Sequence, residues 1–344
     1  MPTSISLLVP GLLGDPLFAP AMRGISLPVL DNLFSAIAEE FPATKDYEQQ
    51  LIALLGGSTK QSQRLSMAQL LGQGRELDHP AYLLASFVHL QADSGRLLMF
   101  GDDGLEIDDT ETQQWLEELR PIFAAHDIEI EALSAECCLL GLRRKPDSVF
   151  SAPQHVIGQD IHRYMPDGED GAMWRSLVNE VQMQLHQSSV NTERQARGQK
   201  AVNSLWFWGD GDSVNLEHNV WQCMVSDDAT ARLLAKRIGI NKLISLAQGD
   251  QLFDQSHDYQ LIVDTTMIGS TRRQDFDTWY SRLNLFIETI AEPVLQALNN
   301  KQLKEVQIYP VNGFYYRVRP SGFGRLFRFF HKQKTFASYL AENS

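Results

Sequence analysis

The chain has 344 residues, a net charge of −13 at pH 7 and a hydrophobic content of 43%. This composition excludes long-range disorder and fits a soluble globular protein, and the length allows two domains or one large domain with an insertion. The acidic balance argues against general nucleic-acid binding, because proteins hold the phosphate backbone through Lys and Arg.

The cysteines and the apolar runs indicate where the protein resides. Cys137, Cys138 and Cys223 give neither a disulfide framework nor a zinc-ligand spacing. No stretch reaches the roughly 18 apolar residues that a membrane span needs, so we expect no membrane partner. The apolar run from Ile5 to Leu13 lacks a preceding basic residue and predicts a buried first strand rather than a signal peptide. We therefore expect a cytoplasmic protein.

The chain opens with a pattern typical of an α/β sheet. A buried strand over residues 5–9 breaks at Pro10-Gly11, and a glycine-containing loop leads to a helix that begins near Pro28. The order of strand, loop and helix is the usual start of such a sheet.

A different pattern begins near residue 86, where short strands alternate with one amphipathic helix. Thr110-x-x-Gln113 predicts the capping box of this helix. We interpret the acidic run from Asp102 to Glu111 as a turn at 101–104 followed by a negatively charged helix start. Strands around one helix predict a small α+β unit, and α/β patterns on both sides of it predict an insertion.

The second half returns to buried strands and long helices. An apolar run over 202–209 predicts a strand that ends in Trp-Gly, and 260–264 predicts a second buried strand. Apolar positions at helical spacing predict one long helix over 275–298. A hairpin over 305–319 is expected to turn at Asn312-Gly313.

One stretch resembles the archaeal-type, cofactor-independent phosphoglycerate mutases, a branch of the alkaline phosphatase superfamily. The matching residues are His186, Val190, Asn191, Arg194, Gly198, Asn203, Trp208 and Gly209. A weaker match covers the frames 8–15 and 28–31. In overall length and in the segment 87–90 the chain is also similar to bacterial proteins described as phosphoglycerate-mutase-like or regulatory.

The resemblance implies an α/β fold, in which an alkaline-phosphatase-like core sheet is flanked by helices and carries an inserted smaller α+β domain. We expect residues 1–80 and 200–344 to form the discontinuous core. Residues 81–199 would then form the inserted domain with a linker and a helix.

The chain departs from the family where the family binds metal. The first strand of the superfamily ends in a metal-binding Asp, and Pro10 stands at that place here. The late strand of the family continues into an Asp…Gly-His context, whereas Asp264 is followed by no His through Ser270. The nearest candidates for the nucleophile are Ser58 and Thr59. A two-metal site needs several converging ligands, so we expect no metal cofactor.

Asn191, Arg194 and Asn203 are candidate substrate-binding residues, since the planar guanidinium of Arg fits phosphate or carboxylate. The alternative is that the Asn side chains bond to nearby backbone while Arg194 is solvated. Trp208 shares a strand face with Trp206, which favours core packing over a binding wall.

Three further candidates come from other parts of the chain. Asp15 lies in the weaker N-terminal match, and Asp264 lies at a strand exit, where it is a candidate for a cleft. His89 lies on a predicted strand, where a hydrogen-bonded structural role is favoured. If the protein were an active enzyme holding Mn²⁺ or Zn²⁺, then Asp15, His89, Asp212 and Asp264 would be the residues to test first.

The leading hypothesis is a phosphoglycerate-mutase-like protein that has lost the two-metal centre and binds an anionic small molecule or partner in a regulatory role. The first alternative is an active metal-dependent phosphotransferase, mutase or hydrolase on a phosphorylated small molecule. The second is a protein-interaction module or homodimer contact that uses the C-terminal segment. Residues 314–344 carry six basic residues against one acidic residue, interleaved with aromatic residues.

Overall fold

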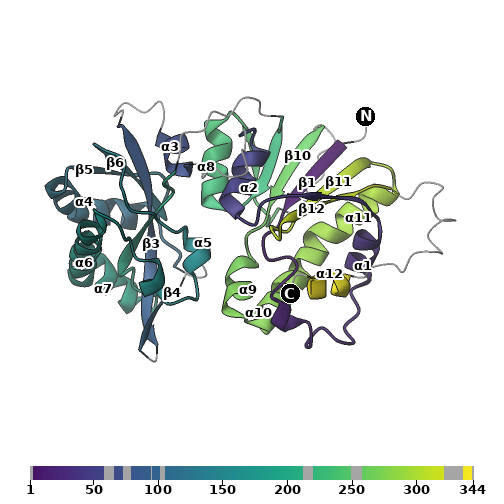
Figure 1. Ribbon diagram of the computed structural model, residues 1–344, viewed down its shortest axis with the longest axis horizontal. Helices are drawn as coiled ribbons and strands as arrows, with labels where there is room; N and C mark the ends of the chain where they lie inside the picture. The colour runs from purple at the N-terminus through teal and green to yellow at the C-terminus, as the bar shows by residue number, and fades with distance from the viewer. Residues whose placement is uncertain are drawn as a thin grey trace. The chain divides into compact units, whose positions relative to one another are not determined.

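The computed structural model describes residues 3–57, 66–72, 79–93, 95–100, 105–211, 220–248, 258–320 and 336–342 (Figure 1). It comprises two units: Met1–Ser58 with Leu216–Ser344, and Thr59–Asn215. None of the helices in these ranges is both long and apolar enough to cross a membrane. The predicted turn at 101–104, the residues Ser58, Thr59 and Asp212, and most of the basic C-terminal segment lie outside the described residues.

The first unit is built on a seven-stranded sheet with the order β2-β12-β11-β1-β10-β8-β9. The five strands from β11 to β9 are parallel, and β12 and β2 add an antiparallel edge. The strands are β1 (Thr3–Leu8), β2 (Ile37–Pro42), β8 (Cys223–Ser226), β9 (Lys242–Ile244), β10 (Tyr259–Val263), β11 (Leu303–Tyr309) and β12 (Phe314–Val318). All residues of β8, and those of β10 from Gln260 to Val263, are buried, because a parallel sheet is covered on both faces.

Helices cover both faces of this sheet (Figure 1). The helices are α1 (Pro28–Ser35), α2 (Tyr47–Leu54), α8 (Ala229–Arg237), α9 (Ile268–Arg273), α10 (Phe276–Phe286), α11 (Glu292–Asn299) and α12 (Phe336–Glu342), with a short 3₁₀ turn at Pro16–Phe18. α1, α10, α11 and α12 share one apolar core, in which Phe34, Trp279 and Phe286 pack against strand residues. α2 and α8 lie on the opposite side of the sheet (Figure 1). The mixed α/β class predicted from the sequence, a central sheet flanked by helices, is confirmed.

The long helix predicted over 275–298 contains a wide turn. α10 passes into a π-helical turn at Ile287–Ala291 before α11 begins. There the backbone N–H of Glu292 donates to the carbonyl of Ile287, five residues back. Pro293 follows directly, and it has no N–H with which to bond the carbonyl four residues before it. Such turns interrupt α-helices rarely and occur frequently at functional sites.

The second unit holds a five-stranded antiparallel sheet. Its central strand β3 (Ala81–Asp93) pairs with β4 (Arg96–Phe100), β6 (Cys137–Leu142) and β7 (Ser204–Trp208), and β5 (Ile128–Ala132) extends the sheet beyond β6. The helices are α3 (Met67–Gly72), α4 (Asp109–Ala125), α5 (Pro153–Val156), α6 (Gly171–Gln187) and α7 (Ser189–Ala196), with a 3₁₀ turn at Ile161–Tyr164. Trp115, Trp174 and Phe207 lie in the core of this unit.

The division differs from the predicted boundaries at residues 80 and 200. β7 belongs to the second unit because residues 204–208 pair with β3, and α3 packs on the same strand. The second unit therefore runs from 59 to 215. The predicted capping box is also displaced by two residues: Asp108 caps α4, and its side chain accepts from the N–H of Glu111 at 2.9 Å.

Candidate functional site

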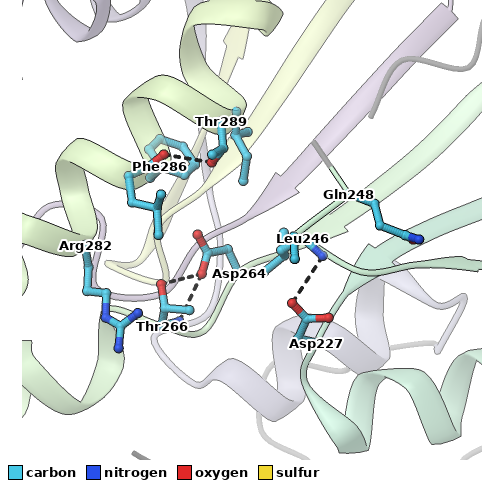
Figure 2. A pocket seen from close by; sticks show the side chains of 11 residues that line it. Asp227, Leu246, Gln248, Asp264, Thr266, Arg282, Phe286 and Thr289 are labelled. Atoms are coloured by element: carbon cyan, nitrogen blue, oxygen red, sulfur yellow. Dashed lines mark hydrogen bonds between the residues drawn. The ribbon is translucent and has the colours of Figure 1, made fainter. Parts of the chain in front are cut away.

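A cavity of about 770 Å³ lies within the first unit, at the carboxyl ends of three neighbouring strands (Figure 2). Asp227 follows β8, residues 246–248 follow β9, and Asp264 and Thr266 follow β10. We call this cavity the carboxyl-edge pocket. Its volume is in the range of sites that take small molecules.

The topology of the sheet explains why a pocket forms there. The chain leaves β8 through α8 to reach β9 on one side, and it leaves β10 through α9 to α11 to reach β11 on the other side. Because crossovers between parallel strands are right-handed, the two connections cover opposite faces of the sheet. Neighbouring strands with diverging connections leave a crevice outside their carboxyl ends.

The remaining wall comes from α10 and the π-helical turn. Arg282, Leu285 and Phe286 lie on α10, and Thr289 and Ile290 lie on the turn. Three of these five side chains are apolar. The pocket therefore combines an apolar wall with a small number of charged and polar groups, as ligand sites do.

Asp264 is the most buried acidic group of the pocket, with 4% of its surface exposed. Its Oδ1 accepts from the backbone N–H of Thr266 at 3.0 Å and from the Thr266 hydroxyl at 2.7 Å. Its other oxygen accepts no hydrogen bond from the described residues, and Figure 2 shows it turned away from Thr266. Burial raises the pKa of this carboxyl above its ordinary value, although the Thr266 hydrogen bonds and the charge of Arg282 oppose the shift.

Arg282 is a cation among the described residues that line the pocket. Its side chain lines the cavity, and the residue is half-buried. Within the described ranges it has no hydrogen-bond or ion-pair partner, while Asp227 accepts from the N–H of Leu246 at 3.2 Å. A half-buried guanidinium without a partner can take an anion in a bidentate arrangement.

Side chains that could bind a metal are scattered over the described part of the chain. Among them no group of three or more His, Cys, Asp or Glu side chains lies close enough to hold a metal ion. Pro10 follows the first strand and offers no side-chain ligand. Asp264, at the exit of β10, is instead occupied at one oxygen by Thr266.

Arg194 is placed by the structure in the interior of the second unit. It is 0% exposed, and its Nη1 donates to Glu111 at 2.5 Å. Nε donates to the carbonyl of Lys200 at 2.9 Å, and Nη2 donates to the carbonyl of Leu105. The alternative of a solvated Arg194 is therefore wrong, because each of its three nitrogens bonds to the protein.

The two asparagines of the same candidate set bond to backbone. The Asn191 side chain bonds to the carbonyls of Leu185 and Val202 and to the N–H of Val202, at 2.7–2.8 Å. The Asn203 amide bonds to both backbone groups of Leu90. These contacts match the backbone-bonding alternative.

The remaining candidates outside the pocket lining also have partners within the protein. Trp208 is 2% exposed and donates from Nε1 to the hydroxyl of Ser86 at 2.9 Å. His89 bonds through Nδ1 to the carbonyl of Ala201 at 2.8 Å. Asp15 caps the 3₁₀ turn at Pro16–Phe18. Of the seven candidates, Asp264 alone lines the pocket.

Sequence reasoning missed Arg282 and Asp227 as pocket residues. Arg282 lies on a helix whose apolar positions define its packing, so a single polar position on it carries no signal. Asp227 follows a buried strand, as Asp264 does, and the same strand-exit argument could have identified it. Ser226-Asp227-Asp228 is also a typical helix-capping sequence, and Asp228 caps α8.

Comparison with known proteins identifies short matches to one kind of enzyme. The chain is 34% identical over 59 residues to the 2,3-bisphosphoglycerate-independent phosphoglycerate mutase of Methanosarcina mazei, a match that covers 17% of this chain and 15% of the relative. It is 27% identical over 70 residues to the enzyme of the same name from Methanothrix thermoacetophila, which covers 20% of this chain and 18% of the relative. This chain thus spans less than a fifth of the length of these curated relatives. No family model matches it.

Two solved structures align with 92% of the chain. One is a cofactor-independent phosphoglycerate mutase from Thermoplasma acidophilum, with a TM-score of 0.41, 16% identity and 89% of that chain covered. The other is the PH0037 protein from Pyrococcus horikoshii, with a TM-score of 0.46, 12% identity and 87% covered. The resemblance to archaeal-type phosphoglycerate mutases is confirmed over the short sequence matches.

Proposed function

We propose that this phosphoglycerate-mutase-like protein binds an anionic small molecule in the carboxyl-edge pocket, without a two-metal centre, and acts in a regulatory role. The observation that carries the proposal is Arg282, a half-buried cation that lines the pocket and bonds to none of the described residues. Leaving such a group desolvated and unpaired is costly, and an anion would offset that cost.

The absence of a converging ligand set in the described ranges supports the metal-free part of the proposal. The alternative is an active metal-dependent enzyme on a phosphorylated small molecule, which the names of the curated relatives favour. The two differ in what the purified protein should contain.

Elemental analysis distinguishes the metal-free binding protein from the metal-dependent enzyme. Protein purified without chelator, and again after incubation with Mn²⁺ and Zn²⁺, is expected to hold far less than one metal ion per chain. Near-stoichiometric metal together with mutase or phosphatase turnover that a chelator abolishes would overturn the proposal.

Anion binding is tested by calorimetric titration with inorganic phosphate, 3-phosphoglycerate and simple carboxylates. Replacing Arg282 with Gln removes the charge and keeps a polar side chain of similar reach. Arg23 is exposed and lies outside the pocket, so Arg23→Gln is the matched control for loss of one positive charge. Anion binding that survives Arg282→Gln unchanged would place the site elsewhere.

A further inference from the structure

We infer that the ligand of the carboxyl-edge pocket is a monocarboxylate with an apolar chain or ring, rather than a multiply charged phosphate ester. The inference rests on the proposed function and specifies the class of anion that the same site takes. It is argued from the balance of charge in the pocket and from the order of side chains along α10.

The charged residues that line the pocket favour a ligand with one negative charge. Among the described residues that line the pocket, Arg282 is the one cation, and it stands with two carboxyl groups, Asp227 and Asp264. A phosphate ester carries nearly two negative charges at neutral pH, of which Arg282 can neutralise one. The second charge would share the pocket with the exposed carboxylate of Asp227, and repulsion between the two disfavours it.

The order of residues along the helix predicts how the ligand is oriented in the pocket. Arg282, Phe286 and Ile290 are spaced four residues apart, so they form a row along one face of the helix. The row runs from α10 into the π-helical turn, with the cation at one end and apolar side chains along the rest. A carboxylate on Arg282 would leave the body of the ligand on Phe286 and Ile290.

The opposite wall is compatible with the same ligand. Leu246 and Ala247, which follow β9, also line the pocket, and Figure 2 shows Leu246 on the side away from the helix. Asp264 lies between the two walls, and burial favours its uncharged form. Its free oxygen can form a hydrogen bond with a hydroxyl or carboxyl group of the ligand.

Isothermal titration with four probes tests this inference: hexanoate, 1-hexanol, inorganic phosphate and 3-phosphoglycerate. We expect hexanoate to bind most tightly. Arg282→Gln should weaken hexanoate binding about tenfold or more, because charge-assisted hydrogen bonds contribute about 1.5–3 kcal/mol. The same variant should leave the weak binding of hexanol unchanged, and Arg23→Gln should leave both unchanged.

The apolar wall is tested at Leu285, which lines the pocket and is 49% exposed, so that its replacement should not unfold the protein. Leu285→Gln should weaken hexanoate and hexanol alike, by about threefold to tenfold for the lost apolar contact. Leu17, which is 66% exposed and lies outside the pocket, provides the control Leu17→Gln.

Each other outcome has a distinct meaning. If 3-phosphoglycerate or phosphate binds more tightly than hexanoate and needs Arg282, the inference fails and the proposed function stands. If none of the three anions binds in an Arg282-dependent way, both fail. If hexanoate binds but neither Arg282→Gln nor Leu285→Gln weakens it, the apolar acid binds outside this pocket and the inference is overturned.

Discussion

The side-chain amide of Asn203 pairs with both backbone polar groups of Leu90. Oδ1 accepts from the Leu90 N–H at 2.7 Å, and Nδ2 donates to the Leu90 carbonyl at 2.8 Å. The backbone N–H of Asn203 donates to the carbonyl of Val88 at 3.2 Å, so the amide extends the pairing of β7 with β3 by one position. The residue thus has a structural role at the start of a strand.

Replacing Asn203 with Ala should destabilise the second unit by about 1–3 kcal/mol, because two backbone groups of β3 lose their partners. Asn203→Asp should also destabilise it, since the carboxylate can accept from Leu90 but cannot donate to its carbonyl. Amide hydrogen exchange at β3 and β7 measures the effect within that unit. A variant with unchanged exchange and lost anion binding would instead assign Asn203 to a ligand.

The buried pair of Arg194 and Glu111 should be costly to break on one side only. Arg194→Met leaves the buried Glu111 carboxylate with the exposed Arg197 as its remaining ion-pair partner among the described residues, and we expect a loss of about 3–5 kcal/mol in the free energy of unfolding. Arg197 bonds to the same Glu111 at 2.5 Å but is 51% exposed. Arg197→Gln should therefore cost within about 1 kcal/mol by urea denaturation. Equal losses in the two variants would contradict this assignment.

Asp264→Asn should become stabilising relative to the wild type as the pH rises. Burial raises the pKa of the native Asp264 carboxyl above its unfolded value, so the native state binds the proton more readily. The stability that this group contributes is therefore complete below the unfolded pKa of about 3.9 and is lost as the pH rises through the native pKa. The Asn variant keeps an oxygen for Thr266 and does not show this loss.

Urea denaturation of both proteins from about pH 4 upward gives the comparison, since the unfolded carboxyl titrates near pH 3.9. Asp277→Asn removes an exposed carboxylate that does not line the pocket and controls for the change in net charge. A wild-type stability that rises with pH relative to the Asn variant would show that the native pKa of Asp264 is lowered.

Substitutions at Gly11 and Gly24 distinguish the backbone strain of an added methyl group from its steric overlap with neighbouring atoms. Both adopt a left-handed backbone, with φ of +83° and +84°. A Cβ at Gly11 would lie 2.8 Å from the Thr271 hydroxyl and 3.0 Å from the Met267 carbonyl, whereas a Cβ at Gly24 would meet nothing within 4 Å. Gly24→Ala should cost about 1–2 kcal/mol from the backbone alone, and Gly11→Ala should cost clearly more by thermal denaturation. Equal losses would show that α9 moves away from the added Cβ without a further loss of stability.

Local patterns in the sequence predicted the elements that depend on local residues. The buried strand over 260–264 appears as β10, and the Asn312-Gly313 turn joins β11 to β12. Pairing between distant segments could not be predicted in this way. The apolar run that forms β7 has no feature that selects β3 as its partner, and its membership in the second unit follows from that pairing.

The candidate site residues show the same difference between local sequence features and contacts between distant segments. Asp264 was identified because a strand exit is a local feature of the sequence. The guanidinium of Arg194 makes it a candidate for anion binding, and the sequence does not reveal its partner Glu111, which lies 83 residues away in a predicted charged helix start. Arg282 was missed because its lack of a partner in the described structure is a property of the folded chain.

The π-helical turn at Ile287–Ala291 sets the phase between two parts of one helix. An α-helix turns by about 100° per residue, so a turn that holds one extra residue rotates everything after it relative to everything before it. Deleting one residue from this turn would restore a regular helix and carry Arg282 and Phe286 around the axis, away from the strand ends, if Val294 and Leu298 kept their places in the core. The pocket wall and the core of the first unit are therefore fixed to each other by the length of the chain, independently of which side chains occupy them.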